Sequence, residues 1–176
     1  MEISPTHKNI VLIGFMGSGK SSVGRILALR FGFPFVDTDH LVIQATGMQI
    51  TEIFKTHGEA WFRDQETLAL ESLAGKGRHI IATGGGIILR ESNAALLKKI
   101  GLVVWLRASE ETIFKRVSRN QKRPLVQTEN PRETIHNLLT LRTPLYTAAA
   151  EFIVDTCDKT HEQVADAIIL EAQRSI

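Results

Sequence analysis

The residues best suited to chemistry lie near the start of the chain. Residues 14–21 read Gly-Phe-Met-Gly-Ser-Gly-Lys-Ser and match the pattern G-x-x-x-x-G-K-[ST] at every fixed position. In this pattern the glycines let backbone N–H groups converge on a phosphate at the positive end of the following helix. Lys20 adds a positive charge near the outer phosphates, and the hydroxyl of Ser21 is a ligand for Mg²⁺. The segment therefore predicts a site for the phosphates of a nucleotide.

Two carboxylates follow a second apolar run, Phe33-Pro34-Phe35-Val36. Asp37 lies nearer this expected strand and would orient a metal ion or its water ligands, whereas Asp39 would accept a proton from a substrate hydroxyl. The alternative is that one of the two only caps the helix expected from about residue 40.

Three consecutive glycines, Gly84, Gly85 and Gly86, follow the apolar run 80–82 and Thr83. Glycines in this position allow backbone N–H groups to approach a ligand closely. An ordinary turn can also contain three glycines, so the glycines alone do not indicate a binding loop. Their position directly after another expected strand is what favours one.

Arg63 lies beside aromatic residues and between two acidic ones. In one interpretation it forms a surface salt bridge with Glu59 or Glu66, four residues before and three after it. In the other, Phe54 and Phe62 shape a small pocket, and the guanidinium pairs with a substrate carboxylate, whose geometry it matches with two hydrogen bonds.

Arg142 shares a helical stripe with Ile135 and Leu138. An arginine on an apolar stripe either extends its charge to the end of the stripe or points into a site. We favour the site, because a buried guanidinium needs an anionic partner.

Five basic residues gather within nine positions: Lys115, Arg116, Arg119, Lys122 and Arg123. We expect residues of about 117–130, which are polar, to form a mobile lid. Placed over a triphosphate, Arg123 would neutralise the charge that develops during transfer, and Arg116 would pack on the adenine face. The alternative is a solvated helix end that the helix dipole favours.

The elements that would position these residues alternate along the chain. Short apolar runs predict strands at 10–13, 34–36, 79–82, 102–106 and 152–154. Apolar spacing and capping signals predict helices at 20–31, 38–46, 51–74, 90–99, 109–119, 131–148 and 161–174. This alternation favours an α/β fold with a mostly parallel sheet covered on both faces. Since ligands bind beyond the carboxyl ends of parallel strands, the loops described above should meet at one edge.

Composition sets the remaining limits. A chain of 176 residues with 43% hydrophobic and 23% charged residues suits one domain over residues 1–176, with a substrate-binding insert at about 38–74. The net charge of +2 gives no reason to expect a nucleic-acid partner. The sequence contains no apolar run of about 18 residues, so we expect no membrane span. One cysteine and an N-terminus without a signal-peptide pattern favour the cytoplasm, and we expect a monomer.

The ordered set of motifs is specific. GFMGSGKS, DTD, FRDQE, TGGG, KRPL and LRTPLY, in this order, closely resemble shikimate kinase over nearly the whole chain. The resemblance implies a three-layer P-loop NTPase fold of the nucleoside monophosphate kinase type, with a five-stranded parallel sheet. It also implies transfer of the ATP γ-phosphate to the 3-hydroxyl of shikimate, giving shikimate 3-phosphate and ADP in the chorismate pathway to aromatic amino acids.

The same resemblance assigns roles by motif. The substrate shikimate would be held by Asp39, Arg63, Gly84, Gly85, Gly86 and Arg142. ATP would be held by Gly17, Ser18, Gly19, Lys20, Ser21, Ser22, Arg116 and Arg123. Mg²⁺, the cofactor, would be held by Ser21 and Asp37, and catalysis would rest on Lys20, Asp39 and Arg123. The loop before the last helix, residues 156–159, lacks the arginine that contacts adenine in this family.

Three other functions are known for proteins with a phosphate-binding loop of this kind. A kinase of the same build that acts on gluconate or a nucleoside monophosphate is the nearest, although the DTD, FRxxE and GGG set favours shikimate. A regulatory GTPase needs N-K-x-D and D-x-x-G motifs, which the sequence lacks. A nucleic-acid-binding ATPase needs a broader basic surface than one lid supplies.

Overall fold

The fold is built on a five-stranded parallel sheet. The computed structural model describes residues 9–118 and 128–174. The strands have the order β2-β3-β1-β4-β5, and every neighbouring pair is parallel. Their bounds are β1 Ile10–Ile13, β2 Phe35–Asp37, β3 Ile80–Ala82, β4 Leu102–Arg107 and β5 Phe152–Asp155. The predicted α/β class and parallel sheet are confirmed, and each strand lies within one residue of its predicted bounds.

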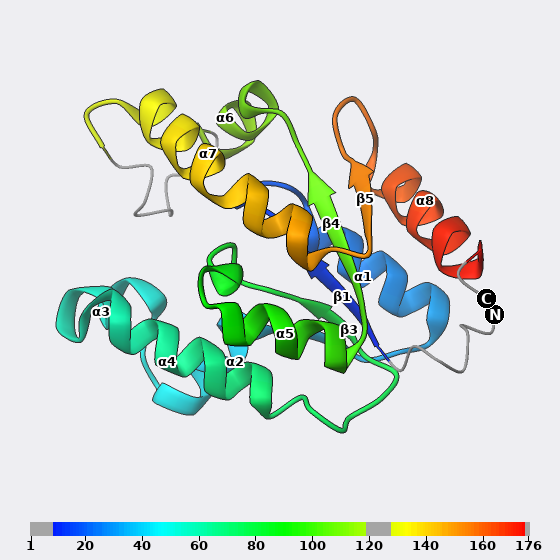
Figure 1. Ribbon diagram of the computed structural model, residues 1–176, viewed down its shortest axis with the longest axis horizontal. Coiled ribbons are helices and arrows are strands. Elements are labelled where there is room, and N and C mark those ends of the chain that lie inside the picture. The colour runs from blue at the N-terminus through cyan, green and yellow to red at the C-terminus, as the bar shows by residue number, and fades with distance from the viewer. Residues whose placement is uncertain (1–8, 119–127, 175–176) are drawn as a thin grey trace.

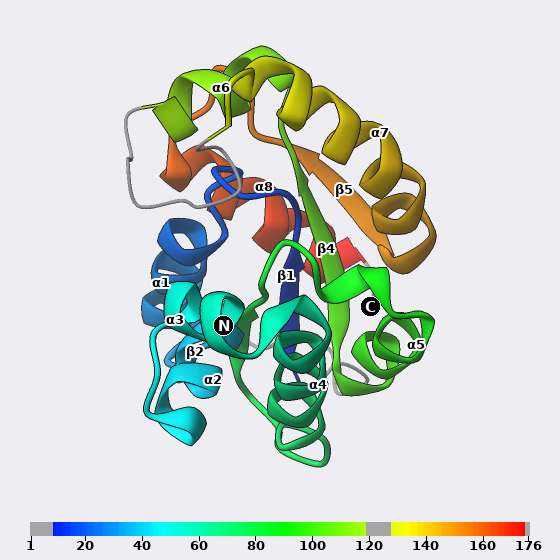
Figure 2. The same ribbon diagram turned by 90° about the vertical axis from the view of Figure 1, so that its left-hand side faces the viewer.

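Helices cover both faces of this sheet (Figures 1 and 2). One face carries α1 Lys20–Phe31 and α8 His161–Arg174, and the other carries α5 Glu91–Ile100, α6 Glu110–Ser118 and α7 Pro131–Ala149. The remaining elements are α2 Thr38–Thr46, α3 Ile50–Thr56, α4 Gly58–Glu71 and the 3₁₀-helix η1 Ile87–Leu89. No helix within the described ranges combines the length and apolar content needed to cross a bilayer.

Helices bury both faces of β1. Since successive side chains of a strand point to opposite sides, alternate residues of β1 pack against different helices. Ile10 and Leu12 pack with α1 and α8, whereas Val11 and Ile13 pack with α5, α6 and α7. A strand buried on both faces must be apolar throughout, which explains the unbroken run of aliphatic residues in β1.

Local capping fixes where the last two long helices begin. The Asn130 side chain accepts a hydrogen bond from the backbone N–H of Glu133, and Pro131 occupies the first helical position of α7. Thr160 and Gln163 exchange hydrogen bonds between their side chains and backbone N–H groups, forming the predicted capping box before α8.

The predicted single helix over 51–74 is wrong. The structure has two helices there, α3 and α4, which meet at His57 and Gly58. Gly58 has φ of 80°, a left-handed conformation that interrupts regular helix geometry and that glycine adopts without steric cost. Together with α2, these helices bury a small cluster of their own, formed by Val42, Ile53, Phe62 and Ala69. The turn lets α3 fold back against α4.

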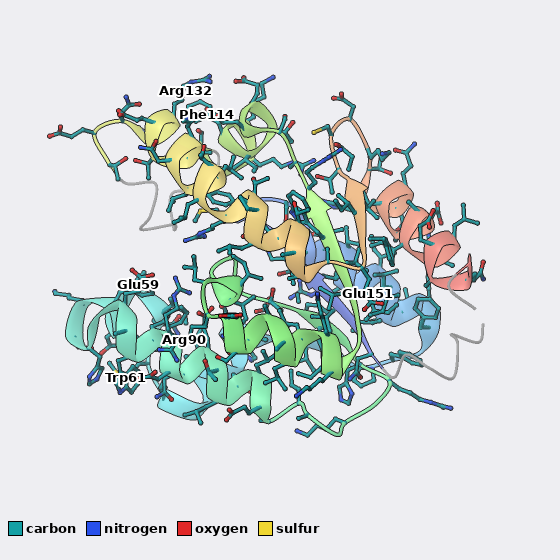
Figure 3. All side chains as sticks on the ribbon, viewed as in Figure 1. Glu59, Trp61, Arg90, Phe114, Arg132 and Glu151 are labelled. Atoms are coloured by element: carbon teal, nitrogen blue, oxygen red, sulfur yellow. The ribbon has the colours of Figure 1, made fainter. Side chains whose placement is uncertain are left out.

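Helices α6 and α7 are joined directly by side chains. The guanidinium of Arg132 lies 4.0 Å from the ring centroid of Phe114, and it forms an ion pair of 2.8 Å with Glu111 (Figure 3). These contacts fix the two helices that flank residues 119–127, which are outside the described ranges.

Gly24 allows α1 to lie close to the edge strand β2, and this contact gives a stability prediction. A Cβ at Gly24 would lie 2.5 Å from a ring carbon of Phe35. We expect Gly24→Ala to lower the free energy of unfolding by about 1 kcal/mol, because overpacking costs more than the gain in helix propensity. Urea unfolding measures this. Leu29→Ala, at an exposed position of α1, is the control and should change stability by less than about 0.5 kcal/mol. A stabilised Gly24→Ala variant would contradict the close packing.

Candidate active site

The phosphate-binding loop lies between β1 and α1, where the sequence predicts it. Gly14, Gly17 and Gly19 have φ values of 145°, 76° and 96°, which side chains rarely allow. A Cβ at Gly14 would also lie 2.6 Å from the carbonyl oxygen of Leu106. The loop therefore needs these glycines to curl around the N-terminus of α1.

The side chain of Lys20 folds back over this loop. Its Nζ donates hydrogen bonds to the carbonyl oxygens of Gly14 and Phe15, at 2.8 and 2.9 Å. Lys20 lines a pocket of about 310 Å³ together with Gly17, Gly19, Ser21, Ser22, Asp37, Asp39, Thr83, Gly84, Gly85 and His161. The predicted phosphate-binding residues thus meet in one place, except that the Ser18 side chain is buried and lies outside the lining.

Asp37 has two roles at once. Its Oδ1 accepts a hydrogen bond from the backbone N–H of Asp39, which caps α2, so the capping alternative is correct for Asp37. Its Oδ2 accepts a hydrogen bond of 3.0 Å from the Ser21 hydroxyl. Hydroxyl and carboxylate oxygens are ligands that Mg²⁺ prefers, so this pair fits a metal bound beside phosphates. The described residues contain no cluster of three His, Cys, Asp or Glu side chains that would hold a metal without a substrate.

A second pocket adjoins the first. It has about 120 Å³ and is lined by Met16, Asp39, Ile50, Phe54, Phe62, Arg63, Glu66, Gly84, Gly85, Gly86 and Arg142. Asp39, Gly84 and Gly85 line both pockets, so a carboxylate stands where the two meet. Phe54 and Phe62, expected to shape a small pocket, both line this one, and their rings pack together with centroids 4.8 Å apart.

Arg63 both forms salt bridges on its own helix and lines a pocket, so each of the two alternatives predicted from the sequence is partly correct. Its guanidinium forms ion pairs with Glu59, at 2.8 Å, and with Glu66, as the surface alternative expects. However, Arg63 is only 8% exposed and lines the second pocket. Glu59, labelled in Figure 3, is the exposed member of the group. Arg63 is therefore a buried cation held in position by acidic side chains on its own helix.

Glu66 is the functional candidate that sequence reasoning missed. It is fully buried, and burial raises its pKa to about 7, against the opposing effect of the Arg63 guanidinium. One carboxylate oxygen accepts a hydrogen bond from Arg63, while Oε1 has no hydrogen-bond partner among the described residues. In the sequence, Glu66 was only a possible salt-bridge partner, because its spacing from Arg63 is typical of a solvated helix surface.

Arg142 is buried in a different way. It is 3% exposed, and its guanidinium lies 5.5 Å from the ring centroid of Phe15. Its Nε has no hydrogen-bond acceptor within residues 9–118 and 128–174, and its charge acts on the buried Glu66 carboxylate, whose pKa it helps to lower. Since a buried guanidinium needs acceptors for its N–H groups, and Nε has none here, the pocket is suited to an anionic ligand.

The glycines after β3 are required by close packing against side chains. A Cβ at Gly84 would lie 2.5 Å from Glu66 Oε1 and 2.6 Å from Asp39 Oδ1. A Cβ at Gly86 would lie 2.5 Å from the central carbon of the Arg63 guanidinium. Side chains at these positions would displace the charged groups, so this loop is part of the pocket wall.

The remaining predicted residues divide into two groups. The Arg116 guanidinium donates hydrogen bonds to the carbonyl oxygens of Gly17 and Thr156, so it ties the phosphate loop to the loop after β5. Arg123 lies outside the described residues. His161, which no sequence signal singled out, lies beside Gly19 and lines the phosphate pocket.

A phosphate-binding loop that adjoins a pocket with two buried guanidinium groups, with a carboxylate at the junction, defines a P-loop kinase of a small anionic substrate. Comparisons with known proteins specify which. A model of the family "Shikimate kinase" matches residues 16–173. Shikimate kinase of Thermodesulfovibrio yellowstonii is 52% identical over 167 residues, covering 95% of this chain and 96% of that protein. The solved structure of shikimate kinase from Acinetobacter baumannii in complex with shikimate has a TM-score of 0.92 at 38% identity, covering 97% and 95% of the two chains.

The chain belongs to the shikimate kinase family, and its activity is the ATP-dependent phosphorylation of shikimate. The resemblance seen in the motifs and the predicted P-loop fold are confirmed. The alternatives of a gluconate or nucleotide kinase, a GTPase switch and a nucleic-acid-binding ATPase are therefore set aside.

The raised pKa of Glu66 predicts a pH dependence of stability. Because the folded state binds the Glu66 proton more tightly than the unfolded state, this stabilisation is full below the ordinary pKa of 4.5 and is lost as the pH rises through about 7. We expect the difference in unfolding free energy between wild type and Glu66→Gln to fall by about 3 kcal/mol at most over this range. Urea unfolding from about pH 5 to about pH 8 measures it. A difference that is constant or grows with pH would show that Glu66 is ionised throughout.

Proposed function

We propose that shikimate binds in the pocket between α4, the glycine loop 84–86 and α7, with its carboxylate on Arg142 and Arg63. The single observation that carries this placement is the buried Arg142 guanidinium, whose Nε has no acceptor among the described residues. Arg63 is already paired with two glutamates, so it adds directional hydrogen bonding more than unbalanced charge. A related enzyme from Acinetobacter baumannii was solved in complex with shikimate, which supports this substrate.

Asp39 is the residue proposed to orient the reacting hydroxyl. It lines both pockets, so a substrate hydroxyl beside it would face the nucleotide phosphates. The 3-hydroxyl of shikimate would then attack the γ-phosphorus of ATP in line with the departing ADP oxygen. Asp39 accepts the hydroxyl proton, although a loose transition state demands little assistance from a base.

Lys20 and the loop amides are proposed to hold the phosphates. The Lys20 ammonium donates to two loop carbonyls, and these donors would turn to the β- and γ-phosphate oxygens when ATP binds. Gly17, Gly19, Ser21 and Ser22 line the same pocket. The roles of Arg116 at adenine and of Arg123 over the phosphates stay predictions, since Arg116 hydrogen-bonds to the protein and Arg123 lies outside the described residues.

Ser21 and Asp37 are proposed to hold Mg²⁺, directly or through water ligands. The hydrogen bond between their oxygens places both groups at the wall of the phosphate pocket. When bound, Mg²⁺ neutralises charge on the phosphate oxygens.

We further propose one domain in which residues 38–74 bind the substrate, because Ile50, Phe54 and Phe62 from this segment line its pocket. A lid at about 117–130 remains part of the proposal. The enzyme is proposed to work as a monomer in the cytoplasm, where ATP is available.

The test of these roles is a crossed kinetic experiment. Arg142→Ala should raise KM for shikimate at least about 100-fold and leave KM for ATP within about twofold, because it removes a buried charge that faces only the substrate pocket. Arg63→Ala should raise KM for shikimate in the same way. A coupled assay of ADP release, with shikimate 3-phosphate identified as product, measures both constants.

Lys20→Ala should lower kcat, the constant for the transfer step, where the arginine variants raise KM for shikimate. We expect its kcat to fall by at least about 100-fold, because Lys20 stabilises charge on the transferring phosphoryl group. Arg30→Ala removes two surface ion pairs, with Glu162 and Asp166, at the far end of α1 and should leave all kinetic constants unchanged. If Arg142→Ala or Arg63→Ala weakened ATP as much as shikimate, the proposed placement of shikimate would be wrong.

A further inference from the structure

Two buried hydroxyl groups hold adjacent residues, Gly84 and Gly85, of the glycine loop 84–86. We infer that Tyr146, together with Thr38, is a positioning residue that sets the orientation of this loop for shikimate binding. The inference rests on the proposed placement of shikimate and assigns neither residue a contact with it. The argument starts from the loop, because three consecutive glycines have more backbone freedom than any other sequence.

The hydroxyl of Tyr146 donates a hydrogen bond to the carbonyl oxygen of Gly85. Tyr146 is fully buried in α7, and its ring stacks on Trp105 of β4 with centroids 5.6 Å apart. Stacking on Trp105 of the sheet therefore holds the Tyr146 ring in place, and the position of the ring sets the position of its hydroxyl group. A buried tyrosine hydroxyl needs a partner, and here its partner belongs to the wall of the shikimate pocket.

This hydroxyl is a permanent donor. Burial raises the pKa of Tyr146 well above its ordinary value, so the group keeps its proton at any pH at which the enzyme works. The nearby Arg142 guanidinium acts in the opposite direction and is outweighed. Because Arg142 lies one helical turn earlier on α7, the same helix carries the substrate arginine and the group that holds the loop facing it.

The second clamp acts on the preceding residue. The backbone N–H of Gly84 donates a hydrogen bond of 3.0 Å to the hydroxyl oxygen of Thr38, which is fully buried at the start of α2. With the Gly84 N–H and the Gly85 carbonyl both engaged, rotation of the intervening backbone is restricted.

Peptide planarity turns these clamps into a statement about direction. The peptide between Gly85 and Gly86 is trans, so its N–H points away from the carbonyl that Tyr146 holds. The carbonyl oxygens of Gly84 and Gly86 accept hydrogen bonds from the backbone N–H groups of Ile87 and Leu89, so the Tyr146 hydroxyl completes the set that fixes this peptide. Without the Tyr146 hydroxyl, this peptide has more freedom to rotate than one between residues with a Cβ. Gly85 is also close to the phosphate loop, since a Cβ there would lie 3.3 Å from the backbone nitrogen of Met16. A loosened loop would thus disturb the pocket wall next to Asp39.

The test is Tyr146→Phe, which keeps the stacked ring and removes only the hydroxyl. We expect KM for shikimate to rise about tenfold, because loop orientation must then be fixed at the expense of binding, while KM for ATP changes less than about twofold. Thr38→Val, which removes the other clamp, should show the same selective rise and serves if Tyr146→Phe does not fold.

The control must lose buried hydrogen bonds elsewhere. Asn9 is buried just before β1, at the amino ends of the strands, and donates from Nδ2 to the carbonyl oxygens of Ile100 and Lys76. This is the end of the sheet opposite to the site. Asn9→Ala should lower the thermal midpoint at least as much as Tyr146→Phe and leave both KM values unchanged. A merely structural role of Tyr146 would make the two variants alike.

The outcomes separate this inference from the proposed function. If Arg142→Ala raises KM for shikimate and Tyr146→Phe leaves it within about twofold of wild type, the positioning role is overturned and the placement of shikimate stands. It is also overturned if Tyr146→Phe raises both KM values together. If Arg142→Ala has no effect on KM for shikimate, the placement itself fails.

Discussion

The site depends on the parallel arrangement of β2, β3 and β1. Because neighbouring parallel strands end at the same edge, the loops that follow them converge without any long-range ordering of their own. The phosphate loop after β1, the carboxylates at the end of β2 and the glycines after β3 become one continuous surface. Asp39, Gly84 and Gly85 line both pockets for this reason. A strand order that moved β2 away from β3 and β1 would separate the two pockets.

Electrostatics divides this surface into two parts with different needs. In the part next to the phosphate loop, Lys20 donates hydrogen bonds to loop carbonyls and Asp37 accepts one from the Ser21 hydroxyl, so both charged groups have protein partners. In the part proposed to bind shikimate, Arg63 is paired with Glu59 and Glu66, whereas the Nε of buried Arg142 has no acceptor among the described residues. The cost of that charge is a reason for the pocket to prefer a carboxylate, since the ligand relieves it.

Sequence patterns predicted the strands, most helices and the loops of the site, because these follow from short-range periodicity and motif spacing. They did not predict the break at Gly58, since apolar spacing continues through it. They treated Glu66 as a surface group, because an i, i+3 pair with an arginine has the same spacing whether exposed or buried. The contacts of Tyr146 and Thr38 join residues 61 and 46 positions apart, which no local pattern reports.

The position of β2 at the margin of the sheet has an evolutionary consequence. The strand that leads into α2, α3 and α4 pairs with one neighbour, whereas β1, which leads into the phosphate loop, pairs with two. Helices α2, α3 and α4 also have an apolar cluster of their own. Exchanging these three helices during evolution would therefore disturb one strand pairing and leave both pairings of β1, and the phosphate loop after it, intact.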